Sequence, residues 1–233
     1  FRNNFGGEEK LHAQFVDMEK TVQGDTLFGL AGGVIAISKN KGNSWSPVYT
    51  KWDSSLWTPN FIHINDNQSS QIFTGGINRF ITPAFMQSHN GGQQWNIYTP
   101  FSKTEAYMND AIVHESNANI LLAGLESDST FTSGRAIIKS DDGASNWNKV
   151  YQGNSILTLT KDQENPNTVF ASGAKQSGHL FYVESKNFGE DWQEHVYKEG
   201  PTGLHTQDLI QVNTNGEKRL YFGTNNGIFS VQL

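Results

Sequence analysis

The stretch SDDGASNW, at residues 140–147, decides the fold because it is one of four copies of the same octet. The other copies are SKNKGNSW at 38–45, SHNGGQQW at 88–95 and SKNFGEDW at 185–192. Their first residues are 50, 52 and 45 positions apart. An internal period of this length is typical of one four-stranded propeller blade, so the octets predict a repeated all-β fold.

A second repeat precedes each octet, a short apolar run that ends in glycine. Its five glycines are 46, 49, 49 and 50 residues apart: Gly29, Gly75, Gly124, Gly173 and Gly223. A further alternating stretch lies upstream of most of these runs, as at 61–64, 111–114, 156–159 and 209–212. Alternation of apolar and polar residues indicates strands. The repeats therefore predict about five blades, each with four strands, in which the octet joins the third strand to the fourth.

The residue types of the octet suit a tight turn. An Asp or Asn at position three can accept backbone N–H groups within the turn. Glycine at position five supplies a positive φ angle, although the third copy has Ala144 there. The tryptophan at position eight is expected to open the fourth strand and to cover the edge of the blade.

The octet resembles the Asp box, also called the bacterial neuraminidase repeat, whose pattern is Ser-x-Asp-x-Gly-x-Thr-Trp. Similar repeats occur in sialidases, in sortilin ectodomains and in photosystem II assembly factors. The resemblance covers nearly the whole chain and implies a single propeller domain over residues 1–233. Three of the four copies carry Asn instead of Asp, so no calcium site is expected at these turns.

The chain start supplies a candidate for the missing last strand. Residues 1–7 align with residues 147–153, because both segments place an aromatic, a second aromatic four residues later and then a glycine at the same spacing. The fifth unit, by contrast, ends without an octet. We therefore expect residues 1–5 to form the outer strand of the last blade and to close the ring, which would remove an open edge.

Composition disfavours several classes of function. The 233 residues carry 17 basic and 23 acidic side chains, for a net charge of −6, which disfavours a nucleic-acid partner. No apolar run approaches the roughly 18 residues of a membrane span. The absence of cysteine excludes disulfides and thiolate ligands. The seven dispersed histidines show no ligand spacing, and neither a metal nor a cofactor is expected. The polar composition and the start at Phe1 favour a secreted or otherwise extracytoplasmic protein.

Candidate binding residues fall on the face opposite the octets, where the loops vary in length. Variable loops on a rigid scaffold are common binding surfaces. The two tryptophans outside the octets, Trp52 and Trp57, lie in one such connection. The polar candidates near the same face are Arg79, Asp110, Arg135, His179, His205 and Asp208. Packing between blades is the alternative for the tryptophans, and solvation is the alternative for the polar residues.

These patterns favour a non-enzymatic scaffold that binds a protein or glycan through the loop-rich face. A sialidase is rejected because the chain has only four arginines and lacks that family's Arg-Ile-Pro motif. No catalytic residue is assigned. The alternative is a carbohydrate-active enzyme or lectin with a pocket at the central opening, since carboxylates suited to glycoside hydrolysis could converge there. A purely structural module of a larger surface protein is a third possibility.

Overall fold

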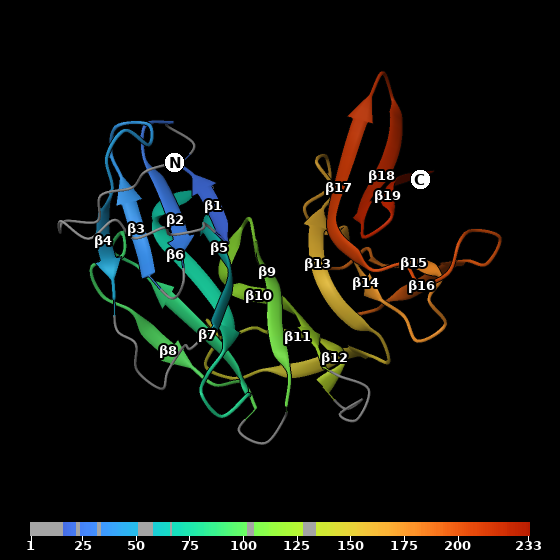
Figure 1. Ribbon diagram of the computed structural model, residues 1–233, viewed down its shortest axis with the longest axis horizontal. Coiled ribbons are helices and arrows are strands. Elements are labelled where there is room, and N and C mark those ends of the chain that lie inside the picture. Colours follow the sequence, from blue (N-terminus) through green and yellow to red (C-terminus); the bar gives the residue numbers. More distant parts are fainter. Residues whose placement is uncertain are drawn as a thin grey trace. The chain divides into compact units, whose positions relative to one another are not determined.

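The computed structural model describes residues 16–21, 24–31, 34–50, 58–65, 67–101, 105–127 and 134–233. Within these ranges the chain folds into short β-strands grouped as five antiparallel sheets (Figure 1). Two compact units divide the chain, Phe1–Lys103 and Thr104–Leu233. No helix of the described residues is long and apolar enough to cross a membrane.

The first unit holds two four-stranded sheets. Sheet 1 consists of β1 (Asp17–Lys20), β2 (Leu27–Ala31), β3 (Val34–Ser38) and β4 (Ser46–Tyr49). Sheet 2 consists of β5 (Thr58–Asn65), β6 (Gln68–Ile77), β7 (Pro83–Ser88) and β8 (Asn96–Tyr98).

The second unit holds three sheets. Sheet 3 consists of β9 (Tyr107–His114), β10 (Asn117–Glu126), β11 (Ala136–Ser140) and β12 (Asn148–Gln152). Sheet 4 consists of β13 (Ser155–Lys161), β14 (Val169–Ala174), β15 (Leu180–Ser185) and β16 (Gln193–Tyr197). Sheet 5 consists of β17 (Thr206–Thr214), β18 (Glu217–Thr224) and β19 (Gly227–Gln232).

The predicted order of strands within a unit is confirmed. Each sheet is a meander of consecutive strands, and in sheets 1 to 4 an octet joins the third strand to the fourth. Sheet 5 has three strands among the described residues. The predicted closing strand, residues 1–5, lies outside the described residues, so ring closure and the single domain over 1–233 both stay predictions.

The octet turns share one hydrogen-bond pattern. The serine Oγ accepts the N–H of position five at 2.7 to 2.9 Å, and the Asx Oδ1 accepts the N–H of position seven at 2.8 to 3.0 Å. The residue at position five is left-handed in all four turns, with φ of 87°, 86°, 75° and 90°. Ala144 is the one non-glycine among them, so the turn imposes this φ even where a Cβ makes it costly.

Each octet tryptophan lies immediately before the fourth strand and not inside it. In three turns its indole N–H donates to the carbonyl of position five at 2.9 to 3.1 Å, which ties the ring to the turn. Trp45 and Trp147 are buried, whereas Trp95 and Trp192 are half-buried. The expected edge-covering role therefore holds most clearly for the first and third copies.

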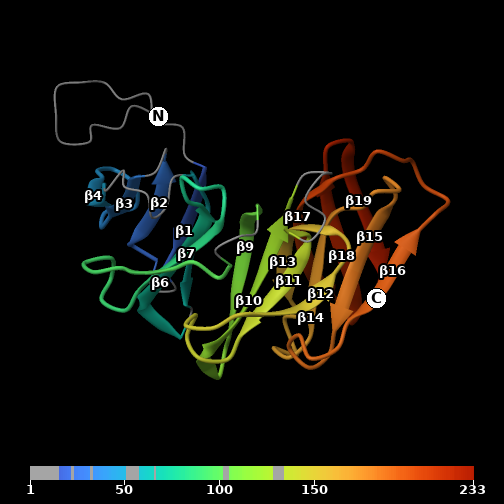
Figure 2. The ribbon, with the colours of Figure 1, turned by 90° about the horizontal axis from the view of Figure 1, so that it is seen from below.

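The core of each unit lies between the faces of neighbouring sheets. In the first unit, Phe28 and Ile35 of sheet 1 pack with Ile62 and Met86 of sheet 2. In the second unit, one apolar cluster joins sheets 3 and 4, and another joins sheet 4 to one face of sheet 5. The ribbons of these three sheets, β9 to β19, are seen together in Figure 2. The apolar side chains are therefore buried between neighbouring sheets, as expected for strands that carry apolar residues on both faces.

Candidate functional site

Aspartates in the first strands of sheets 1 and 3 tie neighbouring sheets together. Asp17 and Asp110 each accept the N–H of the following residue through Oδ1, at 2.7 and 2.8 Å. Their Oδ2 atoms accept a backbone N–H from the first strand of the next sheet: Ile62 at 2.9 Å for Asp17, and Leu159 at 2.7 Å for Asp110. Each carboxylate therefore bridges two sheets through main-chain donors, and charge-assisted bonds of this kind are strong.

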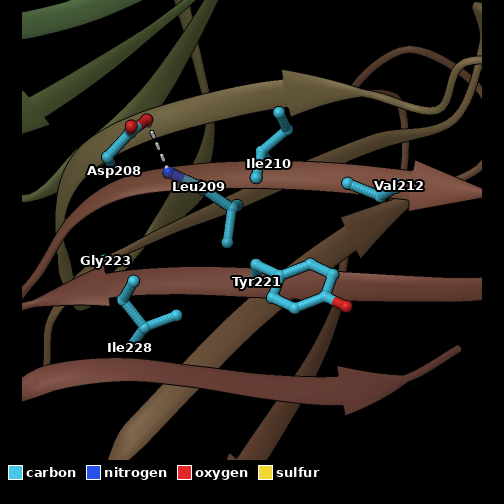
Figure 3. A pocket seen from close by; sticks show the side chains of 7 residues that line it. All are labelled: Asp208, Leu209, Ile210, Val212, Tyr221, Gly223 and Ile228. Carbon is cyan, nitrogen blue, oxygen red and sulfur yellow. Dashed lines mark hydrogen bonds between the residues drawn. The ribbon is translucent and has the colours of Figure 1, made fainter.

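Asp208 occupies the equivalent position in sheet 5. Its Oδ1 accepts the N–H of Leu209 at 2.8 Å, as in the other two sheets. Within the described part of the chain, its Oδ2 has no such donor from a next sheet. The residue is exposed and lines a groove of about 390 Å³ across β17, β18 and β19 (Figure 3).

The groove is mostly apolar: Asp208 contributes a carboxylate and Tyr221 a phenol, and the other side chains that line it are aliphatic. Its lining is Asp208, Leu209, Ile210, Val212, Tyr221, Gly223 and Ile228. The side chains of Ile210 and Ile228 are 53% and 80% exposed. A second hollow of about 400 Å³ shares Val212 and Tyr221 with the groove and is otherwise polar. We call the face formed by Asp208, Ile210, Val212, Tyr221 and Ile228 the open face of sheet 5.

The opposite face of sheet 5 is packed on sheet 4. Leu209, Leu220 and Phe222 are buried there against Phe170 and Tyr182. This contact holds the open face in a fixed orientation relative to sheet 4.

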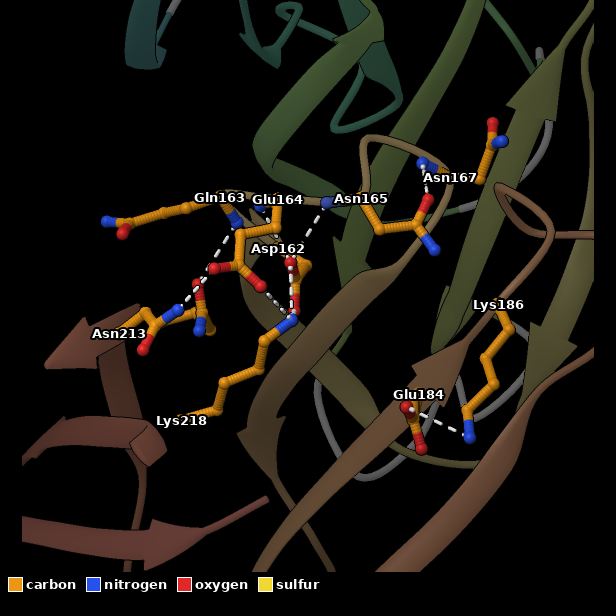
Figure 4. Close-up of polar contacts among 10 residues, drawn as sticks. Asp162, Gln163, Glu164, Asn165, Asn167, Glu184, Lys186, Asn213 and Lys218 are labelled. Carbon is orange, nitrogen blue, oxygen red and sulfur yellow. Dashed lines mark hydrogen bonds and ion pairs between the residues drawn. The ribbon is translucent and has the colours of Figure 1, made fainter. Parts of the chain in front are cut away.

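A polar cluster at the other end of the same contact adds to it (Figure 4). The Nζ of Lys218 lies 2.9 Å from Asp162 Oδ2 and 3.0 Å from Glu164 Oε2. Burial opposes ionisation of Asp162, but the hydrogen bonds from Lys218 and from the N–H groups of Glu164 and Asn165 outweigh it. They hold the pKa of the Asp162 carboxyl below its ordinary value.

A second exposed apolar feature lies in the loop between β6 and β7, residues 78–82. Asn78 Oδ1 accepts the N–H groups of Phe80 and Thr82, and this turn presents Phe80 at 63% and Ile81 at 41% exposure. The guanidinium of Arg79 lies 4.7 Å from the ring centroid of Phe80. Ile81 has a φ of 59°, a conformation that is strained for a β-branched residue.

The remaining predicted residues occupy different surroundings. Trp52 and Trp57 lie outside the described residues. Arg135 is half-buried and donates from Nε to the carbonyl of Ser127 at 3.3 Å. His179 precedes β15, and its Nδ1 is buried with no hydrogen-bond partner in the structure. His205 is exposed, and its N–H donates to Asn225 Oδ1. Their roles in ligand binding stay predictions.

Sequence reasoning named Asp208 and Arg79 but missed their apolar neighbours. The sequence did not distinguish the first group, Ile210, Tyr221 and Ile228, from ordinary strand residues. It likewise did not distinguish Phe80 and Ile81 from ordinary loop residues. Among the described residues, no group of three His, Asp or Glu side chains is placed to hold a metal ion.

Comparison with solved structures shows the fold. The chain superimposes on the GH74 xyloglucanase of Xanthomonas campestris with a TM-score of 0.59 and 14% identity, over 96% of this chain and 36% of that one. It matches YCF48 of Cyanidioschyzon merolae at 0.56 and 14%, over 94% and 71%. The propeller domain of Myceliophteria thermophila Swd1 matches at 0.63 and 12%, over 98% and 72%.

These likenesses do not extend to sequence. No protein-family model and no curated protein matches the chain. The chain spans 31 to 44% of the length of three GH74 enzymes that it resembles. At this level of identity the similarity establishes architecture alone. The described sheets and their structural neighbours together show that the chain has a β-propeller fold.

Proposed function

We propose that the chain is a non-enzymatic recognition protein that binds a protein partner through its loop-rich face. The observation that carries this proposal is the loop 78–82, which holds an arginine, a phenylalanine and a strained isoleucine outward together. Arginine and aromatic residues are enriched at the centres of protein interfaces. A loop that keeps Ile81 at positive φ is also pre-organised, which lowers the entropy lost on binding.

The proposal includes the relationship to Asp-box propellers that the octets of the sequence suggested. The four octet turns share the Ser and Asx hydrogen bonds expected of an Asp box, which supports membership of that group of propellers. The photosystem II assembly factors of this group, to which the YCF48 neighbour is related, act by holding a protein. The polar composition supports an extracytoplasmic location.

A carbohydrate-active enzyme is the second candidate, and the likeness to GH74 enzymes favours it. Glycoside hydrolysis ordinarily needs two carboxyl groups about 5 to 10 Å apart across a cleft. The groove of sheet 5 is lined by one carboxylate, Asp208, among apolar residues. This lining supports binding over hydrolysis.

The test compares two single substitutions in sheet 2. Phe80→Ala removes the exposed ring on the loop-rich face, and Ile97→Ala removes a residue of the same 41% exposure as Ile81 but near the octet end. Immobilised wild type and both variants are exposed to the surface proteins of the source cell. We expect a partner that wild type and Ile97→Ala retain and Phe80→Ala loses. Equal capture by all three would contradict the proposal.

A glycan array and a panel of polysaccharides that includes xyloglucan test the second candidate. We expect no release of reducing sugar. Hydrolysis that is abolished by replacing one carboxylate would establish the enzyme in place of the protein-binding scaffold. If the protein binds glycans on the array and Phe80→Ala loses this binding, the loop-rich face is the binding face but its partner is a glycan and not a protein.

A further inference from the structure

Asparagine followed by glycine occurs three times in the chain, at residues 90–91, 215–216 and 226–227. Such a pair can rearrange without an enzyme, because the backbone nitrogen of the glycine can attack the side-chain carbonyl carbon of the asparagine. Glycine leaves that nitrogen the least hindered, since it has no Cβ. Whether a pair reacts in the folded protein depends on how firmly hydrogen bonds hold the asparagine side chain and the glycine N–H.

The first pair is held in place by the octet turn of sheet 2. Asn90 Oδ1 accepts the N–H of Gln94 at 2.9 Å and the hydroxyl of Ser88 at 3.1 Å. The N–H of Gly91 donates to the carbonyl of Ser70 at 2.9 Å. An attack by the Gly91 nitrogen would have to break these bonds, so the octet protects Asn90 from this reaction.

The third pair is held by the ladder of sheet 5. Gly227 is the first residue of β19 and pairs with Thr224 of β18. The Oγ1 atom of Thr224 accepts the N–H of Asn226 at 3.1 Å and donates to the carbonyl of Gly227 at 2.8 Å. The backbone is therefore fixed on both sides of the bond about which Asn226 would have to rotate.

The second pair forms the two-residue tip between β17 and β18. Thr214 and Glu217 pair with each other on either side of it. Asn215 and Gly216 have φ of 54° and 84°, and both are exposed. Within the described part of the chain, neither the Asn215 side chain nor the Gly216 N–H forms a hydrogen bond. A Cβ at Gly216 would meet no atom within 4 Å, so the space around this glycine is open.

We propose that Asn215 is a site of spontaneous deamidation in the folded protein. The Gly216 nitrogen loses its proton to hydroxide and bonds to Asn215 Cγ, while the bond from Cγ to Nδ2 breaks and ammonia leaves with a proton from water. The product is a five-membered succinimide. Water then opens either of its two carbonyl–nitrogen bonds, which yields aspartate or isoaspartate, and nothing is oxidised or reduced. The tip can rotate into the reactive geometry without breaking a hydrogen bond of the Asn215 side chain or the Gly216 N–H.

The products differ from asparagine in charge and in backbone length. Both carry a new carboxylate two residues before that of Glu217. Isoaspartate also adds one carbon to the main chain of a two-residue tip, whose length and conformation set the register of the flanking strands. The pairing of Thr214 with Glu217 is therefore distorted in the modified chain. Because the released ammonia is not regained, modified chains accumulate as the protein ages. The reaction is independent of the partner-binding loop 78–82.

The test follows the folded 233-residue protein during incubation in warm, mildly alkaline buffer. Trypsin cuts after lysine and arginine, so the three pairs fall in separate peptides, residues 80–103, 199–218 and 220–233. Deamidation adds one mass unit, and fragment spectra locate it. We expect modification at Asn215 to be at least ten-fold faster than at Asn90 or Asn226. In guanidinium chloride the three rates should become similar, because the folded structure alone distinguishes the pairs.

Asn215→Gln should abolish the modification of peptide 199–218, because attack on a glutamine side chain must close a larger ring and is much slower. Labelling by a carboxyl methyltransferase specific for isoaspartate should fall in this variant, and an unaltered melting temperature confirms that it folds. Asn226→Gln is the matched control and should leave the rate at Asn215 unchanged. Three outcomes would overturn the inference: equal rates for the three pairs of the folded protein, faster modification at Asn90 or Asn226, and no mass gain over a period that modifies the unfolded chain.

Discussion

In sheet 3 the side chain of Ile137 is fully buried against sheet 4, whereas in sheet 5 the equivalent Ile228 stands 80% exposed. The two sheets share an aspartate within the first strand, the glycine opposite it and the isoleucine opposite that glycine. What differs is the strand laid over them. The comparison teaches that the same register of aspartate, glycine and isoleucine occurs both in a sheet whose isoleucine is buried and in one whose isoleucine is exposed.

We expect the largest loss of stability when the anchor of β12 is removed, because β12 is the outer strand that sheet 3 has and that the described part of sheet 5 lacks. Trp147 is buried immediately before β12, and its indole N–H donates to the Ala144 carbonyl. Trp147→Ala should lower the free energy of unfolding by about 3–5 kcal/mol, the usual cost of a large buried truncation. Urea unfolding followed by circular dichroism measures it. An unfolding midpoint within error of wild type would contradict the anchoring role of the octet tryptophan.

The matched isoleucines test the comparison itself. Ile137→Ala should cost about 2–4 kcal/mol because it leaves a cavity between sheets 3 and 4. Ile228→Ala should change stability by less than about 0.5 kcal/mol because the side chain is exposed. Both variants are measured in the same urea series. A cost above about 2 kcal/mol for Ile228→Ala would show that the face of sheet 5 is covered in solution.

Substitutions of the matched aspartates, Asp110 and Asp208, should differ less in their cost to stability. Asp110→Asn replaces one of two acceptor oxygens and leaves either the Ala111 or the Leu159 N–H poorly satisfied, at a cost of about 1.5–3 kcal/mol. Asp208→Asn can keep its single bond to Leu209 and should cost less than about 1 kcal/mol. Thermal unfolding of both variants compares them. Equal costs would mean that Asp208 also bridges to a neighbouring strand within the folded chain.

The smallest effect concerns the polar cluster that holds sheet 5 on sheet 4. Because the pKa of Asp162 is lowered in the folded state, its contribution to stability is present above the unfolded pKa of about 3.9 and is lost as the pH falls below it. Asp162→Asn should therefore be less stable than wild type at pH 7, and this difference should shrink between about pH 4 and pH 2. A difference that stays constant over that range would contradict the assigned shift.

Much of the fold was predictable, because period and turn chemistry are local. The octets placed the third and fourth strands of sheets 1 to 4, and the glycine runs placed the second strands. Ala144 shows how local the signal is, since the Ser and Asx bonds keep the turn even without glycine at position five.

The candidate site was predictable only in part. Asp110 and Asp208 were both identified, but their difference depends on which strand lies over each carboxylate, and that is a long-range property. Ile81 could not be recognised from sequence, because its positive φ comes from the hydrogen bonds that Asn78 makes around it.

The bridging carboxylates also bear on the order in which the protein opens. Asp17 joins sheet 1 to sheet 2, and Asp110 joins sheet 3 to sheet 4, so these bonds couple the sheets in pairs. Sub-global unfolding often follows such contiguous pairs. In native-state hydrogen exchange, the amides of Ile62 and Leu159 should exchange only when a whole pair separates, while those at the exposed end of β19 exchange first.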